Sequence, residues 1–351
     1  MVQRVVGRND LQEGLHLIND ERSGLSGVIA IHSTALGPAA GGCRFWHYES
    51  DEAMTHDAVR LARGMSYKNA LAGLPFGGGK AVLRRPLGEF DRAALFGAFG
   101  DAVAALGGSY ITAEDVGTSL DDMHAVHQRT SFVAGLEPQP GKAGGDPSPW
   151  TALGVFQSIQ AASKLTFGSD VEGLTVAIQG VGNVGAHLCR LVKEAGGRLI
   201  IADVDRARVN HLAQELDARV VDVDDILAVE ADVFAPCALG AVLNDYSIPR
   251  LKARLVCGAA NNQLATDEDG AALLERGIVY APDYLVNAGG IINVSAEYLG
   301  ETTEQVRQRV GQIPNRLAAL LASADRDRRP THRVADEMAE QIIVSARRVA
   351  A

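Results

Sequence analysis

Short apolar runs alternate with amphipathic stretches through the second half of the chain. Six runs have the length and apolar content of strands: Leu174–Gln179, Arg198–Ala202, Arg219–Val221, Ala231–Ala235, Arg254–Gly258 and Gly277–Ala281. Helical stretches separate most of them, which is typical of a doubly wound parallel sheet. After about Gly300 the pattern predicts helix, and Val334–Val349 is expected to form a C-terminal helix.

The first 145 residues mix strand and helix patterns. The spacing of Met54, Ala58, Leu61 and Met65 predicts a helix over Asp51–Ala72 with one apolar face. The other elements expected here are a strand at Gly27–Ser33, a helix at Phe90–Leu106, a strand at Ser109–Thr112 and a helix from Ser119, where Asp122 completes a capping box. The stretch Pro138–Pro149 is dense in Pro and Gly, which predicts a loop and a domain boundary.

Two lysines stand out in this pattern. Lys68 continues the apolar face of the predicted helix, where burying an ammonium without an anionic partner is costly. The alternative is a lysine near the helix end that extends its ammonium to water. Lys80 follows Gly77–Gly79, and we interpret these glycines as a loop that brings Lys80 close to a small ligand. Leu74 and Ala81 do not fit a triphosphate-binding loop.

Composition and charge narrow the classes of function. A chain of 351 residues has room for two domains, and its net charge of −10 argues against nucleic acid or an anionic membrane as the main partner. No apolar run reaches the roughly 18 residues of a membrane span, and the N-terminus lacks the apolar core of a signal peptide. The four scattered cysteines and nine histidines form no ligand cluster. We therefore expect reduced thiols, a cytoplasmic protein and no metal site.

The segment Gly180–Gly185 matches the pattern G-x-G-x-x-G in the context that gives it meaning. It follows the strand-like Thr175–Gln179 and opens a helical stretch, Val184–Glu194, and the next strand ends at Asp203. The first glycine permits a tight turn, the second lets the backbone meet a pyrophosphate, and the third allows close helix–strand contact. Asp203 would bind the adenosine ribose and repel a 2′-phosphate, which favours NAD over NADP, although Arg208 could soften that preference. The alternative is a turn that merely has the same glycine spacing.

Polar side chains follow several of the predicted strands. Asp115, Asn261, Asn287 and Cys237 all lie in such positions, where ligand groups gather in a doubly wound sheet. An ordinary loop or helix-capping residue is the alternative for Asp115 and the two asparagines. Cys237 lacks the histidine partner of a nucleophile, and we interpret it as packing within a cofactor loop.

These segments together resemble the glutamate, leucine, phenylalanine and valine dehydrogenase family. The likeness rests on Gly37–Arg44, Gly64–Lys80, Tyr110–Gly117, Pro147–Thr151, Gly180–Gly185, Ala235–Gly240, Gly258–Gln263 and Asn287–Gly290, and it runs in order from about residue 10 to 345. The likeness is greatest to the leucine dehydrogenases of the family, and the valine dehydrogenases come next.

The resemblance implies an enzyme and a fold. The reaction would be reversible, NAD-dependent oxidative deamination of an L-amino acid to its 2-oxo acid and ammonia. The fold would be α/β with two domains separated by a cleft. Residues 1–145 would form a mixed α/β domain for substrate binding, catalysis and oligomerisation, with a C-terminal helix at about 330–351 packing back on it. Residues 146–329 would form a Rossmann-type doubly wound NAD-binding domain, and the protein would be a homo-oligomer.

The resemblance also implies roles for single residues. Lys68, helped by backbone N–H groups near Gly41 and Gly42, would bind the substrate carboxylate. Lys80 would be the general base that activates water, and Asp115 would handle protons at the amino group. A lysine acts as a base only when neutral, and we expect the Lys68 charge, desolvation and the oxidised nicotinamide to favour that form. Asn261 would orient the substrate; the cofactor contacts would come from Gly180, Val181, Gly182, Asn183, Val184, Gly185, Asp203, Arg208, Thr151, Cys237, Ala238, Asn261 and Asn287.

The substrate side chain is expected to be apolar. Family positions that line its pocket hold Ala40, Ala113, Ile291 and Val294 here, and a buried anionic side chain would be unpaired among them. We therefore expect a branched-chain substrate (leucine, valine or isoleucine). The small residue at Ala40 leaves phenylalanine as the alternative. A hydroxy-acid dehydrogenase would need a catalytic histidine, and a non-enzymatic NAD sensor would not need both lysines and Asp115.

Overall fold

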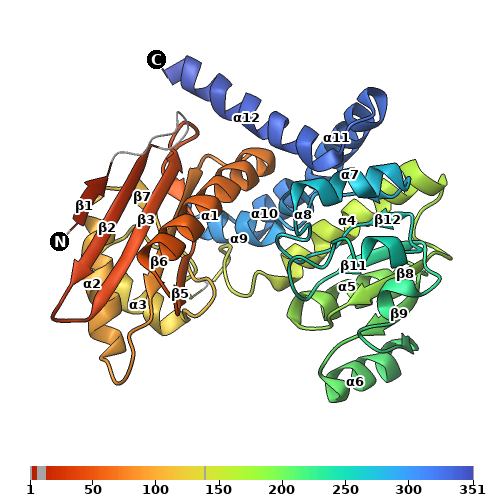
Figure 1. Cartoon of the computed structure of the whole chain (residues 1–351), viewed down its shortest axis with the longest axis horizontal. Helices are drawn as coiled ribbons and strands as arrows, with labels where there is room; N and C mark the ends of the chain where they lie inside the picture. Colours follow the sequence, from red (N-terminus) through yellow and green to blue (C-terminus); the bar gives the residue numbers. More distant parts are fainter. Residues whose placement is uncertain (1, 6–12, 138–139, 351) are drawn as a thin grey trace. The chain divides into compact units, whose positions relative to one another are not determined.

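The computed structural model describes residues 2–5, 13–137 and 140–350, and these divide into two compact units. Unit 1 comprises Met1–Gly145, Val294–Thr303 and Ala339–Ala351; unit 2 comprises Asp146–Asn293 and Glu304–Met338. Figure 1 follows both along the chain. Two of the predictions concern segments that the structure does not fully describe. Most of the N-terminal segment, where no signal peptide is expected, lies outside the described residues, as does part of the Pro- and Gly-rich loop.

Unit 1 is built on a sheet with strand order β1-β2-β3-β6-β4-β7, and β5 also pairs with β6. The strands are β1 Val2–Val5, β2 Gly14–Asp20, β3 Leu25–Ser33, β4 Ala39–Ala40, β5 Cys43–Trp46, β6 Gly77–Arg84 and β7 Tyr110–Ile111. Strands β1, β2, β3 and β6 are antiparallel neighbours, whereas β4 and β5 run parallel to β6. Strand β6, which carries Lys80, is therefore paired along both edges.

Helices of unit 1 pack against its sheet. The apolar side of α1 (Asp51–Ala72) packs with strand residues such as Val28 and Val82, and α2 (Arg92–Ala104) and α3 (Leu120–His127) share a second core cluster with Phe45. The predicted capping box at Ser119 and Asp122 is present. All five elements predicted for this segment are confirmed, with ends shifted by one to two residues in most cases.

The apolar face predicted for α1 is partly wrong. Its fully buried positions include Met54, Ala58 and Ala62, whereas Leu61 and Met65 are only half-buried. Lys68 is half-buried as well, at the margin of the buried face. The helix is thus rotated from the orientation that the sequence pattern suggested, because Ala62 and Ser66 fit closer to the sheet than the larger side chains do.

The loop predicted at Gly77–Gly79 is also wrong, because these residues begin strand β6. Because these glycines have no side chains, neighbouring elements can pack closely against the strand. A β-carbon on Gly77 would lie 1.8 Å from the carbonyl oxygen of Ser33, and one on Gly78 would lie 2.0 Å from the backbone nitrogen of Ser66. The glycines let α1 and β3 approach the strand, and this close packing holds Lys80 on a rigid element.

Unit 2 contains the predicted doubly wound sheet. Its strand order is β10-β9-β8-β11-β12-β13, and every pair is parallel. The strands are β8 Thr175–Gln179, β9 Arg198–Ala202, β10 Arg219–Val220, β11 Val233–Pro236, β12 Leu255–Val256 and β13 Val279–Tyr280, so all six predicted strands are confirmed. The helices are α4 Ser148–Phe167, α5 Asn183–Glu194, α6 Arg206–Leu216, α7 Asp267–Glu275 and α8 Asp283–Val286, with 3-10 turns at Ile226–Ala228 and Ile248–Arg250.

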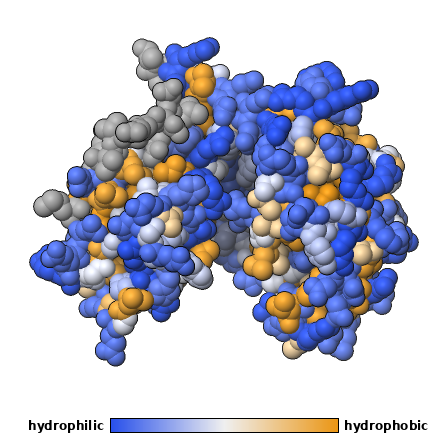
Figure 2. Space-filling model, viewed as in Figure 1, coloured by the Kyte–Doolittle hydropathy of each residue, from blue (hydrophilic) through white to orange (hydrophobic). Residues whose placement is uncertain are grey.

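The rest of the chain is helical. It forms α9 Gly289–Tyr298, α10 Thr303–Val310, α11 Ile313–Asp327 and α12 Thr331–Ala350. The end of α12, from Ala339 onward, groups with unit 1, and its beginning groups with unit 2. No described helix is long and apolar enough to cross a membrane. Figure 2 shows polar side chains over most of the face in view.

Candidate functional site

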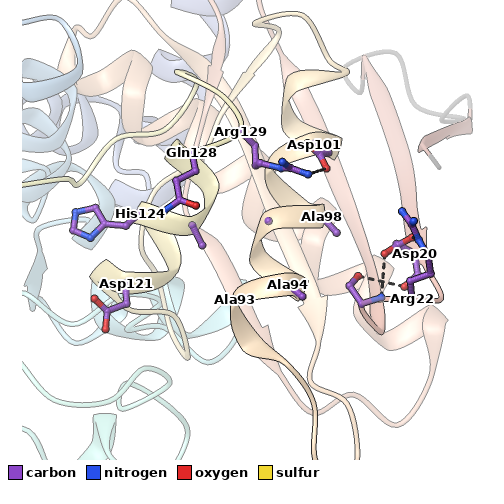
Figure 3. A pocket seen from close by; sticks show the side chains of 13 residues that line it. Asp20, Arg22, Ala93, Ala94, Ala98, Asp101, Asp121, His124, Gln128 and Arg129 are labelled. Carbon is purple, nitrogen blue, oxygen red and sulfur yellow. Dashed lines mark hydrogen bonds and ion pairs between the residues drawn. The ribbon is translucent and has the colours of Figure 1, made fainter.

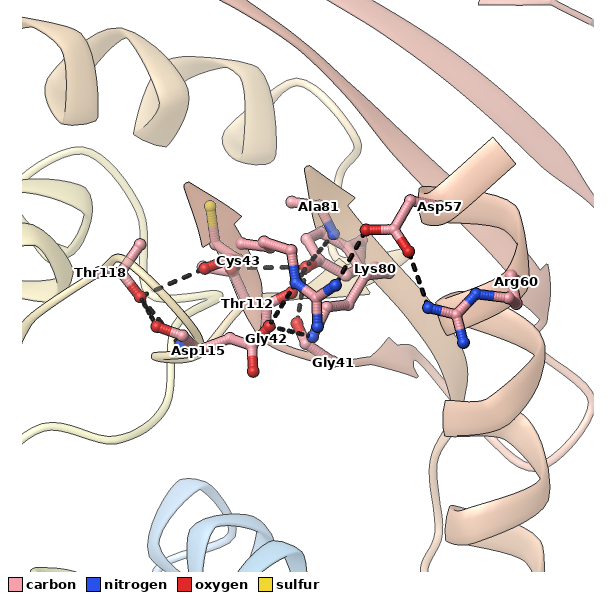
Figure 4. A network of polar contacts seen from close by, with 12 residues as sticks. Gly41, Gly42, Cys43, Asp57, Arg60, Lys80, Ala81, Thr112, Asp115 and Thr118 are labelled. Carbon is pink, nitrogen blue, oxygen red and sulfur yellow. Dashed lines mark hydrogen bonds and ion pairs between the residues drawn. The ribbon is translucent and has the colours of Figure 1, made fainter. Parts of the chain in front are cut away.

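An ion pair between Lys80 and Asp115 lies at the centre of a polar network in unit 1 (Figure 4). The Lys80 Nζ atom lies 2.7 Å from Asp115 Oδ2, and the Lys80 side chain is only 7% exposed. Arg44 Nε lies 3.5 Å from the same carboxylate oxygen, and Asp57 holds the Arg44 guanidinium at 2.9 Å. Strand β6 and the segment after β7 thus bring together the two residues predicted to do proton chemistry.

The environment of Asp115 keeps its carboxyl group ionised. Burial opposes ionisation, but the Lys80 ammonium, its hydrogen bond and the Arg44 guanidinium outweigh burial and lower the pKa of Asp115 below its ordinary value. The carboxylate is therefore an acceptor for the Lys80 ammonium and a base of low proton affinity. Arg44 lies within the family-like segment, but its role was not predicted, because its distance from Asp115 depends on the fold.

Gly41 and Gly42 let the main chain approach this ion pair. A β-carbon on Gly41 would lie 1.9 Å from the Gly79 carbonyl oxygen, and one on Gly42 would lie 2.8 Å from the β-carbon of Asp115. The Gly41 N–H donates to the Ile111 carbonyl at 3.2 Å. Of the two amides predicted to bind a substrate carboxylate, that of Gly41 is thus used by the sheet, and that of Gly42 stays the candidate.

Lys68 lies near the C-terminal end of α1, between two anchored neighbours. Asn69 Nδ2 donates to the Gly77 carbonyl oxygen at 2.6 Å, which fixes the helix to the start of β6. On the other side, the Tyr67 hydroxyl donates to Glu340 of α12, and Arg63 Nε donates to that hydroxyl at 3.0 Å. Lys68 and Lys80 therefore project from two elements that are bonded to each other.

The glycine turn of unit 2 is tightly packed at Gly180 and Gly185 and open at Gly182. Gly180 has a φ of 93°, and a β-carbon on Gly185 would lie 2.0 Å from the Gly180 carbonyl oxygen. Gly182 caps the start of α5, and a β-carbon there would meet nothing within 4 Å. Open space at the positive end of a helix suits a pyrophosphate. Asp203, after β9, accepts a hydrogen bond from the Val181 N–H at 2.7 Å, which ties the acidic residue to the turn.

A second group of predicted residues lies within unit 2. Asn287 Nδ2 donates to Asn261 Oδ1 at 2.9 Å and to the Ala259 carbonyl oxygen at 3.1 Å. The Thr151 hydroxyl donates to the Pro147 carbonyl oxygen at 3.1 Å, and a β-carbon on Gly290 would lie 2.7 Å from that hydroxyl. The structure thus pairs Asn261 with Asn287 and places Thr151 against the start of α9.

Cys237 follows β11 beside the glycine turn. Its β-carbon lies 3.5 Å from where a β-carbon on Gly185 would be, and its neighbour Ala238 packs against Gly180. Burial raises the pKa of the Cys237 thiol to about 12, so the thiol is protonated at neutral pH. These contacts support packing as its role.

The four residues predicted for the substrate side chain are divided between the units. Ala40 on β4 and Ala113 after β7 belong to unit 1, as does Val294 on α9, whereas Ile291 belongs to unit 2. Ala40 is buried and directly precedes the Gly41–Gly42 pair. Within unit 1, Ala40 is thus the predicted pocket residue that lies next to the glycines packed against the Lys80–Asp115 pair.

Comparison with known proteins decides the family. Residues 15–132 match a family model described as the dimerisation domain of the Glu/Leu/Phe/Val dehydrogenases, and residues 146–207 and 199–350 match one described as glutamate/leucine/phenylalanine/valine dehydrogenase. The chain belongs to the Glu/Leu/Phe/Val dehydrogenase family. The predicted family, fold class and enzyme class are therefore confirmed.

Several members of the Glu/Leu/Phe/Val dehydrogenase family are similar over almost the whole chain. The leucine dehydrogenase of Geobacillus stearothermophilus is 49% identical over 94% of this chain and 90% of its own. The valine dehydrogenase of Streptomyces coelicolor is 44% identical over 95% of this chain and 93% of its own. The crystal structure of L-tryptophan dehydrogenase from Nostoc punctiforme has a TM-score of 0.87 and 38% identity, covering 96% of this chain and 97% of that one.

Unit 1 also contains a surface cavity with a different lining. It has a volume of about 570 Å³ and lies over α2 and α3 in unit 1, where Ala94, Ala98, Asp101, His124 and Arg129 are among its lining residues (Figure 3). Arg129 is paired with Asp101 at 2.9 Å. No residue predicted for catalysis or cofactor binding lines this cavity. Within the described ranges, no cluster of His, Cys, Asp and Glu could hold a metal ion.

Proposed function

We propose that this member of the family catalyses NAD-dependent, reversible oxidative deamination of a branched-chain L-amino acid to its 2-oxo acid and ammonia. The observation that carries the proposal is the ion pair between buried Lys80 on β6 and half-buried Asp115 in the segment after β7, whose charged atoms lie 2.7 Å apart. The leucine and valine dehydrogenases named above, at 44–49% identity over nearly the whole chain, support it.

In the proposed reaction, Lys68 binds the substrate α-carboxylate and Lys80 acts on water. Deamination requires water to attack the carbon that bears the imino group, and a neutral Lys80 removes a proton from that water. Asp115, whose Oδ2 atom lies 2.7 Å from Lys80 Nζ, handles protons at the substrate amino group. Asn261 orients the substrate.

The residues of unit 2 fit the nicotinamide cofactor that this chemistry needs. The turn at Gly180–Gly185 would hold the pyrophosphate of NAD, and Asp203 would bind the ribose hydroxyls, with Thr151 and Asn261 at the nicotinamide end. Bound there, the cofactor would supply the acceptor for the hydride that leaves the substrate. The open space at Gly182 and the tie between Asp203 and Val181 support this placement.

The proposed substrate side chain is apolar, because Ala40, Ala113, Ile291 and Val294 offer no cation to a second carboxylate. An aromatic L-amino acid is the second candidate. It is favoured by the small side chain at Ala40 and by the likeness in fold to the tryptophan dehydrogenase. One methylene of difference in such a pocket is worth about 1–3 kcal/mol, so the pocket size decides between the two.

We also propose that the protein works as a homo-oligomer in the cytoplasm, with small molecules as its other partners. The match of residues 15–132 to a domain described as a dimerisation domain supports the first part. All four cysteines are free, as expected in a reducing compartment, and this supports the cytoplasmic location.

Absorbance of the reduced nicotinamide, measured with a panel of L-amino acids, tests the function. Turnover with leucine, valine or isoleucine is expected. Lys80→Ala should lower kcat by about 10²–10⁴-fold, whereas Lys252→Ala, at an exposed ion pair with Glu230, should leave it unchanged. No turnover with any branched-chain or aromatic amino acid would refute the proposal, as would near wild-type kcat in Lys80→Ala.

A further inference from the structure

Two aspartates share the short segment between β9 and α6 where the adenosine end of NAD is proposed to bind. Asp203 Oδ1 accepts a hydrogen bond from the Asp205 N–H at 2.8 Å. Asp205 in turn caps α6, since its Oδ1 accepts from the Arg208 N–H at 3.0 Å. The second oxygen of Asp205 lies 3.3 Å from Arg208 Nη2. The side chain of Asp205 therefore contacts both the backbone and the guanidinium of Arg208.

Arg208 is the group in this segment best suited to bind a phosphate. It lies in the first turn of α6, close after the acidic residue at the end of β9, and an arginine nearby is what accommodates the 2′-phosphate of NADP in dinucleotide-binding folds. The Arg208 side chain is 52% exposed and so within reach of a ligand. The neighbouring Arg206 is paired with Asp222, so it is held by a different carboxylate.

The ion pairs around this segment decide whether the Arg208 guanidinium is available to bind a phosphate. Asp203, Asp205 and Asp222 supply three negative charges, and Arg206 and Arg208 supply two positive ones, which leaves one net negative charge around the segment. A 2′-phosphate carries up to two negative charges. It would meet Asp203 directly, and it would have to compete with Asp205 for the guanidinium of Arg208.

We propose that Asp205 is a specificity-determining residue that excludes NADP by holding the charge of Arg208. This inference rests on the proposed function, in which the glycine turn and Asp203 bind NAD. Asp203 repels the phosphate, and Asp205 withholds the one guanidinium that would otherwise offset that repulsion. The preference for NAD then depends on two carboxylates.

The two roles of Asp205 can be separated by a conservative substitution. Asparagine is as good an N-cap as aspartate, so Asp205→Asn keeps the hydrogen bond to the Arg208 N–H while it removes the charge. A purely structural role for Asp205 predicts no change in ligand preference in this variant. A role through Arg208 predicts tighter binding of a ligand with a 2′-phosphate in this variant. That gain in affinity should disappear when Arg208 is also replaced.

Calorimetric titration of the full chain with ADP and with adenosine 2′,5′-bisphosphate tests this, because only the second probe carries a 2′-phosphate. The probes also differ at the 5′ position, a diphosphate in ADP and a monophosphate in the bisphosphate, so each variant is compared with the wild type for the same probe. Asp205→Asn should strengthen binding of the bisphosphate about tenfold, as expected for one charge a few ångströms away, and should change ADP affinity less than twofold. Asp205→Asn combined with Arg208→Ala should lose the gain. The same variants should show a parallel change in the ratio of kcat/KM with NADP to kcat/KM with NAD.

Asp217→Asn is the control, because it removes an exposed carboxylate at the far end of the same helix. It should leave both titrations unchanged. If ADP binds but Asp205→Asn brings no gain, or if the gain persists without Arg208, the inference about Asp205 is wrong while the nucleotide site stands. If the wild-type protein binds neither ADP nor the bisphosphate, the proposed nucleotide site itself is wrong.

Discussion

Removing Asp115 should destabilise unit 1 more than removing Lys80 does. In Asp115→Asn, the ammonium of Lys80 stays in a site that leaves its side chain 7% exposed, and Asp115 is its one ion-pair partner among the described residues. In Lys80→Met, the carboxylate of Asp115 keeps Arg44 at 3.5 Å and is itself 26% exposed. The first substitution thus leaves an ammonium without its ion-pair partner, whereas the second leaves a carboxylate that still has Arg44 nearby.

The distances set the size of the effect. The attraction across 2.7 Å is about 6 kcal/mol at an effective dielectric constant of about 20, and desolvation of both groups offsets much of it. Breaking a buried pair by removing one partner costs about 3–5 kcal/mol. We expect Asp115→Asn to lower the free energy of unfolding of unit 1 by that amount at pH 7. Lys80→Met should lower it by about 1–2 kcal/mol, because the remaining pair with Arg44 is partly exposed to solvent.

The chain offers a reporter for this measurement, because its two tryptophans lie in different units. Trp46 lies on β5, paired in register with Arg84 of β6, and Trp150 lies on α4 of unit 2. Urea unfolding followed by fluorescence in a Trp150→Phe background therefore reports on unit 1. Protein concentration must be constant, since association shifts apparent stability. An equal or larger loss in Lys80→Met would refute the reasoning.

The dependence on pH gives an independent check of the same pair. Because the folded state lowers the pKa of Asp115 below its ordinary 3.8, its stabilising contribution is complete above that value and is lost as pH falls through the lower folded pKa. The difference between wild type and Asp115→Asn should therefore be constant from pH 7 to about pH 5. It should shrink only below about pH 4.

Three further predictions follow from other contacts. Gly182→Ala should leave the melting temperature unchanged but weaken nucleotide binding at least tenfold in a titration with ADP, whereas Gly185→Ala should lower the melting temperature, because its β-carbon would lie 2.0 Å from a carbonyl oxygen. Burial and the nearby Arg63 lower the pKa of His32 to about 4, so stability should fall as pH drops from 6.5 toward 4; His32→Gln should remove up to about 3 kcal/mol of that fall in unfolding titrations. Glu340→Gln should raise the substrate KM several-fold with little change in kcat, because it loosens the helix end that presents Lys68; an equal fall in kcat would contradict this positioning role.

Much of the secondary structure could be predicted from the sequence, although strands β1, β2, β4, β5 and β6 of unit 1 were not. The six strands of unit 2, the helix Asp51–Ala72 and the capping box at Ser119 are all present. These features depend on residue spacing and on contacts within a few residues. The Gly180–Gly185 turn was predictable for the same reason, since its strand, turn and helix follow one another along the chain.

The tertiary structure alone decided how those elements meet. The glycines before Lys80 were interpreted as a loop, but they form a strand because Ser33 and Ser66, far away in the chain, lie against them. The orientation of α1, and with it the half-burial of Lys68, depends on which side chains fit against that sheet. Arg44 was missed near Asp115 because its contact spans dozens of residues. Local periodicity determines where helices and strands form, whereas distances between residues remote in sequence depend on packing, and the proposed chemistry of Lys80 and Asp115 depends on such a distance.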